Sequence, residues 1–380
     1  MKITSLNQLE RALQVTWSDG SLDEFPFIWL RDNDPRELHP DTGERIFDLT
    51  RVDLKIVPDN FSLVTDKGAA QGIRINWPGK QSSSNYSADW LLQHRPGRRR
   101  FDPALIQRES WHAEQMSSLP RFDVSACESS DEKLLNTLQT LKRKGIVIIE
   151  GLADNLAAGE RFGDLIGFKR ESNYGVMFEV KSKPKPNNLA YTALALPLHT
   201  DLANQESVPG FQFLHCYRNN ACGGGSIFAD GLAIVKDFKQ ECPEHYRLLS
   251  EVEVPWHFQD EETDLRQRRP VIGLGADGSF KSLTFNAHLA DIPDFATKLL
   301  YDFYAAFQEL MRRIRNPKYD IEYVLASGEM VIFDNLRILH GRASFDPESG
   351  ERHLRGYYIE HNEVDNRIRM LAKLNHSGLT

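Results

Sequence analysis

The stretch "ALALPLHTDLANQ", from Ala193 to Gln205, carries a histidine and an aspartate two positions apart at the end of a segment with extended character. In an extended chain, residues i and i+2 point to the same face, so His199 and Asp201 can both reach one metal ion. The tripeptide alone is not specific. His-x-Asp/Glu also occurs at His39, His112 and His361.

The other three copies have a less suitable local context. His39 lies in the Pro/Gly turn "ELHPDTGER", and His112 lies in a segment with helical character. On a helix, side chains at i and i+2 point about 200° apart and cannot grip one ion. His361 ends the last expected strand, where the chain turns helical. Geometry therefore favours His199 and Asp201, although two ordinary polar residues at a strand end remain an alternative.

A candidate third metal ligand and a basic side chain lie far C-terminal to this stretch. "FDNLRILHGRASFDPESGERHLRGYYIE", from Phe333 to Glu360, places His340 after one expected strand and Arg352 on the next, and we expect a hairpin to bring them together. Two histidines and one carboxylate with open positions are the facial triad of non-haem Fe(II) oxygenases. Arginine suits the far carboxylate of a 2-oxo acid, because its planar guanidinium can donate two parallel hydrogen bonds to the two carboxylate oxygens. Taken singly, His340 and Arg352 are better explained as a surface histidine and a salt-bridged arginine.

Length and composition indicate a globular protein of about two domains, at roughly 100–200 residues per domain. The chain has 380 residues, of which 41% are hydrophobic and 26% charged. Its net charge of −8 argues against nucleic acid as a partner. The one basic run, "HRPGRRRF" from His94 to Phe101, has the character of a solvated loop, with an anion site as the alternative.

The sequence also predicts neither a disulfide scaffold nor a membrane protein. The four cysteines have no CxxC spacing. No run of 18 apolar residues is present and the N-terminus has no apolar signal region, so we expect no membrane partner and a cytoplasmic location.

The pattern of elements predicts an α+β, mainly β protein. Residues 1–95 alternate apolar and polar side chains around turns such as Asp19-Gly20 and form a small β-rich domain. Residues 96–120 are rich in Pro, Arg and Gln, typical of a linker. Residues 121–380 combine helices near 131–145 and 294–316 with strands near 146–152, 210–218, 328–335 and 355–361, which favours a β-sandwich or a jelly roll.

One glycine motif points to a different class of protein. "GLGADG", from Gly273 to Gly278, matches the dinucleotide-binding pattern and would suit a nicotinamide-dependent dehydrogenase. The pattern requires a following helix, whereas "SFKSLTF" has strand character and Asp277-Gly278 is a hairpin turn signal. The motif therefore predicts a hairpin.

Several stretches together resemble a known family. "NNLAYTALALPLHTD", "GFQFLHC", "GGGSIFADG", "FDNLRILHGR" and "RHLRGYY" are similar, in this order, to the catalytic jelly roll of Fe(II)/2-oxoglutarate dioxygenases of the taurine dioxygenase superfamily. "WLRDN" and "ADWL" resemble the N-terminal domain of its γ-butyrobetaine and trimethyllysine hydroxylase branch. The resemblance covers nearly the whole chain. It implies a double-stranded β-helix (jelly roll) preceded by a small β-rich domain.

The resemblance also implies roles for individual residues. His199, Asp201 and His340 would bind Fe(II), and Arg352 and Ser226 would hold 2-oxoglutarate, with O₂ as the second cosubstrate. The branch binds a trimethylammonium group in an aromatic cage, because π-faces stabilise a cation that donates no hydrogen bonds. The cage positions here are Tyr174, Phe178, Tyr191 and Tyr358, and two further substrate contacts would be Asn188 and Asn286. Phe178 stands where butyrobetaine enzymes have Trp, which makes one wall smaller.

The implied activity is hydroxylation of a small quaternary ammonium substrate, with γ-butyrobetaine, the precursor of carnitine, as the best single choice. The alternatives are trimethyllysine or a trimethylammonium phosphonate as substrate, and a non-catalytic binding protein on the same fold. Relatives often hold a structural zinc in the N-terminal domain with three Cys and one His. Because "WLRDNDPRELHPD" has no Cys, we expect no structural zinc here. The resemblance also implies a homodimer.

Overall fold

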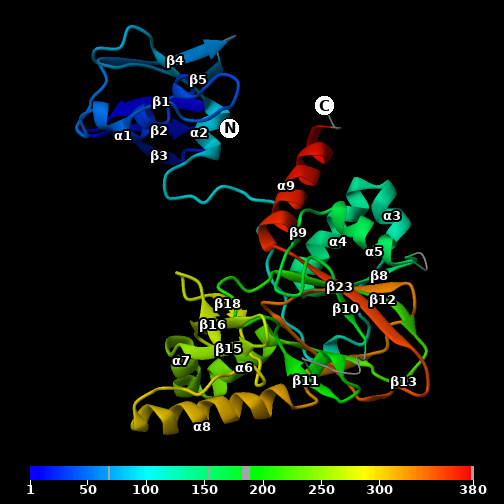
Figure 1. Cartoon of the computed structure of the whole chain (residues 1–380). Helices are drawn as coiled ribbons and strands as arrows, with labels where there is room; N and C mark the ends of the chain where they lie inside the picture. Colours follow the sequence, from blue (N-terminus) through cyan, green and yellow to red (C-terminus); the bar gives the residue numbers. More distant parts are fainter. Residues whose placement is uncertain (67–68, 153–154, 182–188, 378–380) are drawn as a thin grey trace. The chain divides into compact units, whose positions relative to one another are not determined.

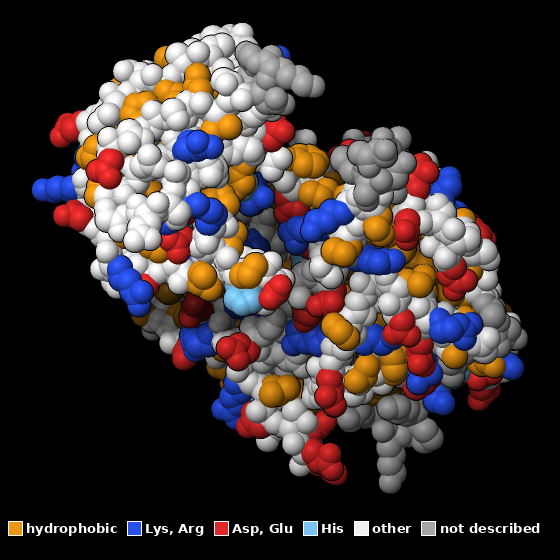
Figure 2. All heavy atoms as spheres, turned by 90° about the horizontal axis from the view of Figure 1, so that it is seen from above, with side chains coloured by type: hydrophobic (Ala, Val, Ile, Leu, Met, Phe, Trp, Pro, Cys, Tyr) orange, Lys and Arg blue, Asp and Glu red, His pale blue; other side chains and the backbone are white. Residues whose placement is uncertain are grey.

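A computed structural model of the chain describes residues 1–66, 69–152, 155–181 and 189–377. The chain forms two compact units, Met1–Asp102 and Pro103–Thr380, and each is described by itself. Within the described residues, no helix is long and apolar enough to cross a membrane. On the face drawn in Figure 2, basic and acidic side chains are interspersed.

The first unit consists of two small antiparallel sheets with short helices (Figure 1). The sheets are β1 (Ile3–Gln8), β2 (Ala12–Trp17) and β3 (Leu22–Pro26), and β4 (Asn60–Asp66), β5 (Ala69–Asn76) and β6 (Ser84–Ser87). The helices are α1 (Phe27–Asp32), η1 (Pro35–Glu37), η2 (Leu49–Arg51) and α2 (Ala88–Gln93). Ser87 caps α2 by accepting a hydrogen bond from the Trp90 N–H at 3.1 Å. Trp17, Phe25, Phe27 and Trp77 are among the side chains of this unit's own buried core.

The second unit is built around two sheets of a jelly roll. The larger sheet has the order β10-β23-β12-β20-β8-β7, with β9 also paired to β23. Its strands are β7 (Arg121–Asp123), β8 (Ile146–Glu150), β9 (Lys169–Arg170), β10 (Phe178–Val180), β12 (Phe211–Asn219), β20 (Glu329–Asp334) and β23 (Arg352–Ile359). The smaller sheet has the order β11-β21-β14-β19 and consists of β11 (Leu196–His199), β14 (Ser226–Asp230), β19 (Asp320–Tyr323) and β21 (Ile338–Arg342). The short strands β13 (Cys222–Gly223) and β22 (Phe345–Asp346) pair with each other.

The larger sheet is buried on both faces, and strand β8 shows how. Val147 and Ile149 belong to the core shared with helices, whereas Ile146 and Ile148 belong to the core that also holds Phe228 of the smaller sheet. This alternation follows from the two-residue period of a strand. The helices on the outer face, seen together in Figure 1, are α3 (Val124–Ser129), α4 (Asp131–Lys144), α5 (Leu156–Asp164) and α9 (His361–Ser377).

Two hairpins and three helices form a separate layer beside the smaller sheet. The hairpins are β15 (Val254–Gln259) with β16 (Asp264–Arg269), and β17 (Ile272–Leu274) with β18 (Phe280–Leu283). The helices are α6 (Gly231–Glu241), α7 (Pro243–Glu251) and α8 (Thr297–Ile314). The "GLGADG" stretch is the β17–β18 turn, as the sequence predicted, with Gly278 at a φ of 73°.

The segment that follows the first unit packs onto the second. Residues 103–120, which include η3 (Ala113–Gln115), lie in the second unit, and Trp111 is 2% exposed. The Trp111 backbone N–H donates to Asp230 at 3.0 Å, and its indole N–H donates to the Lys144 carbonyl at 2.9 Å. A Pro- and Arg-rich composition indicates irregular backbone, and here that backbone is held by hydrogen bonds to the jelly roll.

Candidate active site

His199, Asp201 and His340 converge at one end of the smaller sheet. His199 ends β11 and lies directly opposite His340 on β21. Asp201 follows two residues after His199, and Leu202 next to it has a φ of 58°, a left-handed conformation that a non-glycine residue rarely adopts. Within the described residues, these three side chains form a group whose ligand atoms all lie within 4.8 Å of one another.

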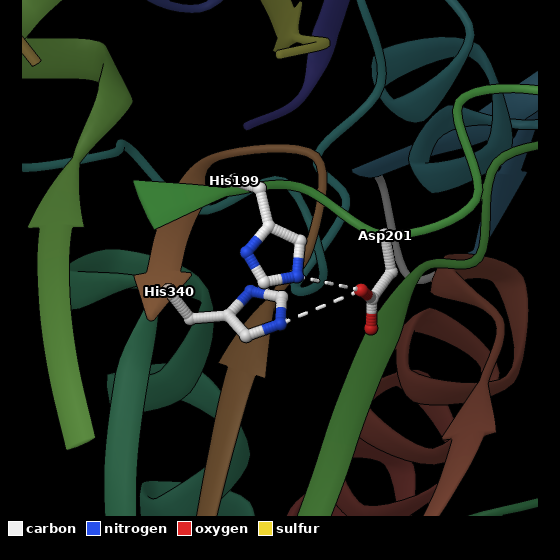
Figure 3. Close-up of side chains that lie close together, drawn as sticks. All are labelled: His199, Asp201 and His340. Atoms are coloured by element: carbon white, nitrogen blue, oxygen red, sulfur yellow. Dashed lines mark ion pairs between the residues drawn. The ribbon is translucent and has the colours of Figure 1, made fainter. Parts of the chain in front are cut away.

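The three side chains are oriented toward a common point. Figure 3 shows a ring nitrogen of each histidine directed at one carboxylate oxygen of Asp201. The His199 Nε2 and His340 Nε2 atoms lie 3.2 Å and 3.5 Å from Asp201 Oδ1. Burial would raise the pKa of Asp201, but the two histidines hold it well below its usual value. The carboxylate is therefore an ionised oxygen donor.

Surrounding groups fix the orientation of the triad. The His199 Nδ1–H donates to the Pro197 carbonyl at 2.9 Å, which leaves the Nε2 lone pair free for a metal. The Asn335 side chain accepts from the Asp201 N–H at 2.8 Å and donates to the Asp201 carbonyl at 3.2 Å. The Tyr358 hydroxyl donates to Asp201 Oδ2 at 2.7 Å. These contacts fix the positions of the three side chains relative to one another.

The triad opens into a cavity, here called the metal cavity. Its walls carry the triad, Arg352, Ser226 and the aromatic residues Tyr174, Phe178, Tyr191 and Tyr358. The Phe178 and Tyr358 ring centroids are 5.2 Å apart. Asn286 is buried beside the second chamber described below, and Asn188 lies outside the described residues.

Arg352 is a buried cation at the wall of the metal cavity. It is 7% exposed, and its Nε–H donates to the Gly224 carbonyl at 3.1 Å. Among the described residues, no carboxylate pairs with it. Burial, together with the nearby Arg342, lowers the pKa of Arg352 to about 10, so the guanidinium is charged at neutral pH. A buried cation of this kind favours an anionic ligand.

The expected hairpin between His340 and Arg352 is wrong. His340 lies on β21 of the smaller sheet and Arg352 lies on β23 of the larger sheet. The residues between them cross from one sheet to the other, and β22 pairs with β13 on the way. The two side chains line the same cavity because their sheets face each other.

Sequence reasoning missed Arg342 and Asn335. Arg342 lines the metal cavity, and its guanidinium donates to the carbonyls of Ala190, Thr192 and Leu194 at 3.1, 2.6 and 2.7 Å. It therefore holds the segment that carries Tyr191. The signal was present, since residues 340 and 342 share one face of a strand. Nothing in the sequence indicates a role for Asn335, because Asp201, the residue whose backbone it contacts, is 134 residues away.

A jelly roll with two histidines and one carboxylate at facing strand ends, beside an open cavity, defines a mononuclear non-haem metal oxygenase. Residues 98–358 match the family described as taurine catabolism dioxygenase TauD, TfdA, and residues 4–92 match the gamma-butyrobetaine hydroxylase-like N-terminal family. The chain belongs to the TauD, TfdA dioxygenase family, and the resemblance inferred from its motifs is confirmed. It is a dioxygenase.

Full-length relatives come from bacteria and animals. The chain is 33% identical to the gamma-butyrobetaine dioxygenase of Pseudomonas sp. (strain AK-1), over 98% of this chain and 96% of the relative. It is 29% identical to the gamma-butyrobetaine dioxygenase of Homo sapiens, over 96% of each chain. It is 28% identical to the mitochondrial trimethyllysine dioxygenase of Bos taurus, over 92% of this chain and 83% of the relative.

The fold is shared with solved structures. The structure of AAD-2 in complex with Mn(II) and N-oxalylglycine has a TM-score of 0.50 at 15% identity, covering 67% of this chain and 97% of that chain. The predicted α+β, mainly β fold with a jelly-roll catalytic domain is therefore confirmed.

Proposed function

We propose that this protein is an Fe(II)- and 2-oxoglutarate-dependent hydroxylase of a small trimethylammonium compound, with γ-butyrobetaine as the substrate and carnitine as the product. The observation that carries the proposal is a single cavity that joins the His199–Asp201–His340 group to four aromatic side chains and to Arg352. The names of relatives at 28–33% identity support the same substrate class.

The donor set fits Fe(II). Two imidazole nitrogens and one carboxylate oxygen would bind one side of the ion and leave its other side open to ligands, which suits non-haem iron. The Nε2 atoms of His199 and His340 both face Asp201 Oδ1, and the His199 tautomer leaves its Nε2 lone pair available. His199, Asp201 and His340 would hold the ion.

Arg352 would bind the distal carboxylate of 2-oxoglutarate, and Ser226 would support it. Both side chains are buried in the wall of the metal cavity. When bound, Fe(II) with 2-oxoglutarate and O₂ supplies the oxidising chemistry that converts a C–H bond to C–OH, with succinate and CO₂ as coproducts. The protein contributes binding, orientation and exclusion of bulk water.

The aromatic side chains would hold the trimethylammonium group. Tyr174, Phe178, Tyr191 and Tyr358 all border the metal cavity, and Tyr358 also touches Asp201. Each cation–π contact stabilises a bound cation by about 0.5–2 kcal/mol. Because Tyr358 joins the aromatic wall to the metal ligand, it would fix the distance between the cation and the reacting carbon. Asn188 and Asn286 remain predicted substrate contacts.

A turnover assay with a substrate panel tests the proposal. The protein, Fe(II), 2-oxoglutarate and air are combined with γ-butyrobetaine, trimethyllysine or a trimethylammonium phosphonate, and succinate and hydroxylated product are measured by mass spectrometry. We expect the largest product yield from γ-butyrobetaine. Substrate-independent succinate with all three compounds would contradict the proposed substrate class, and the absence of any succinate would favour a binding protein.

Two histidine variants provide a matched comparison. His340→Ala is expected to abolish product formation and Fe(II) binding. His39→Ala changes a His-x-Asp copy that lies in an exposed turn of the first unit, and it should leave both unchanged.

The assembly and location are separate proposals. We propose a homodimer in the cytoplasm that uses neither nucleic acid nor membrane as a partner. Support comes from the family resemblance and from the net charge of −8. Sedimentation velocity would test the dimer, since a concentration-independent mass of 43.5 kDa would contradict it.

A further inference from the structure

A second chamber adjoins the metal cavity. The two spaces share His199, Asp201, Tyr174 and Tyr358. Arg352 and Ser226 border the metal cavity alone, whereas the second chamber has its own polar side chains, His257, Gln259, Asn286 and His288. A ligand whose cation rests on the shared tyrosines can therefore extend past the metal ligands into this chamber.

Hydrogen bonds through Thr200 fix the position of His288 relative to the metal ligands. The Asn286 amide donates to the Thr200 carbonyl at 3.3 Å, and its oxygen accepts from the His288 N–H at 3.1 Å. The Thr200 N–H and hydroxyl both bond to the backbone of Phe285, at 2.7 Å and 2.9 Å. Because Thr200 stands between His199 and Asp201, the turn that carries His288 is fixed relative to the triad.

His288 is an exposed residue that lines the chamber, and its ring has no hydrogen-bond or ion-pair partner among the described residues. The neighbouring His257 differs, since its ring nitrogens lie 3.0 Å from Asp264 and 3.5 Å from Asp291. Asp264 also binds Arg266 at 2.8 Å. Asp264 and Asp291 are thus paired with His257, and Asp264 also with Arg266, while the His288 ring N–H remains available to a ligand.

We propose that His288 donates a hydrogen bond to the anionic end, a carboxylate or other oxyanion, of a zwitterionic trimethylammonium substrate. His288 then selects zwitterions over cations that lack the acid group. The inference rests on the proposed function and assigns the residue that recognises the end opposite the cation. Asn286 can assist, because one of its two amide hydrogens is used by Thr200 and the other is free to bond.

Calorimetric titration tests the inference without turnover. γ-Butyrobetaine, a zwitterion, and its carboxamide analogue, a cation that lacks the carboxylate charge, are each titrated, under nitrogen, into protein loaded with Fe(II) and 2-oxoglutarate. His288→Leu should raise the Kd for γ-butyrobetaine about tenfold to a hundredfold, as expected for loss of a hydrogen bond to a charged group. The Kd for the carboxamide should change much less. His288→Gln keeps a donor and should recover part of the affinity.

The outcomes separate this inference from the proposed function. His39→Leu, in the first unit, serves as the control and should leave both Kd values unchanged. Equal losses for acid and amide in His288→Leu, or no loss for either, would overturn the role of His288 while the substrate assignment stands. If the unmodified protein neither binds nor hydroxylates any trimethylammonium compound, the proposed function fails and this inference fails with it.

Discussion

At the residue scale, Tyr358 combines two roles that one substitution can separate. Its ring borders the metal cavity, and its hydroxyl donates to Asp201 Oδ2 at 2.7 Å. Burial and the nearby Asp201 raise the pKa of Tyr358 well above 10, so it stays a donor at physiological pH. Tyr358→Phe removes only the hydroxyl, and we expect Fe(II) affinity to fall about 10- to 100-fold, as for other groups that orient metal ligands.

Anaerobic calorimetry with Fe(II) measures this effect, and Phe178→Ala is the reciprocal control. Phe178 contacts the Tyr358 ring but no metal ligand in the described structure, so its loss should weaken γ-butyrobetaine binding and spare the metal. Equal Fe(II) affinity in Tyr358→Phe and the unmodified protein would show that the hydroxyl does not support Asp201.

The residues of the site differ in how far the sequence could predict them. The His199–Asp201 spacing and the extended segment before it identified two members of the triad, since i and i+2 share a face. The same spacing at His112 and His361 proved structural. Those rings contact Asp237 at 3.0 Å and Asp334 at 2.9 Å. Local context in the sequence disfavoured these two copies, but only the tertiary structure shows the carboxylates that their rings contact, because Asp237 and Asp334 are distant in sequence.

At the element scale, strand and helix positions were predictable and their pairing was not. The expected strand near 146–152 is β8, and the expected helix near 131–145 is α4, ended by Gly145 at a φ of 83°. The crossing between β21 and β23 had no local signal, because a turn between two strands usually makes a hairpin. Sheet switching depends on long-range pairing, here between β13 and β22.

A buried ion pair ties several of these elements together. The Arg337 guanidinium donates to both Asp230 oxygens at 2.9 Å and to the Glu109 carbonyl at 2.6 Å, and both charged side chains are 0% exposed. Arg337→Met leaves Asp230 charged and unpaired, so we expect a loss of about 3–5 kcal/mol in the free energy of unfolding.

Urea denaturation followed by fluorescence checks this loss. The double variant Arg337→Met with Asp230→Leu removes both charges and should be more stable than the single variant. A single variant as stable as the unmodified protein would contradict a role for this pair in holding the segment around Glu109.

Asp237 on α6 predicts a pH dependence of stability. Burial opposes ionisation, but hydrogen bonds from Lys318, His112 and Tyr319 lower its pKa to about 2. Because the folded pKa lies below the unfolded value of about 3.9, the stabilisation is present above pH 4 and is lost as the pH falls toward 2. Asp237 contributes about 1–2 kcal/mol to the free energy of unfolding, because solvent screens its interaction with the exposed Lys318.

The comparison of Asp237→Asn with the unmodified protein in urea, at pH values between 7 and 2.5, measures this contribution. The stability difference should be constant from pH 7 to about pH 5 and should shrink at lower pH. Asp302→Asn, on an exposed face of α8, is the control. A difference that grows as the pH falls would contradict the assigned pKa shift.

At the scale of the whole molecule, the metal content of the chain is a direct prediction. In the described residues, His199, Asp201 and His340 form a group that could hold a metal ion. The first unit contains no Cys that could bind zinc. We expect the unmodified protein to hold one iron per chain after reconstitution, as measured by inductively coupled plasma mass spectrometry. In the His340→Ala variant, the same measurement should find no bound zinc. Stoichiometric zinc that survives this substitution would indicate a second site.

An ion network joins two segments of the first unit. Asp34 is 1% exposed and accepts hydrogen bonds from the Lys80 ammonium at 2.6 Å and from the Ser84 hydroxyl. Lys80 also binds Glu37 at 2.9 Å, so one cation joins η1 to the loop after β5. Burial raises the pKa of Asp34, but Lys80 and Ser84 outweigh this effect and lower it.

Lys80→Met should therefore destabilise the first unit alone. The substitution removes the nearer of the two cations beside the buried Asp34 carboxylate, since Arg36 lies 4.0 Å away, and we expect a loss of about 2–4 kcal/mol, less than for a fully buried pair because Lys80 is 19% exposed. Hydrogen–deuterium exchange of the full chain, read by mass spectrometry, should show faster exchange within residues 1–102 and unchanged exchange in residues 103–380. Lys55→Met, at an exposed position of the same unit, is the control. Faster exchange throughout the chain would instead show that the two units unfold together, and unchanged exchange in residues 1–102 would show that hydrophobic packing, rather than Lys80, stabilises this unit.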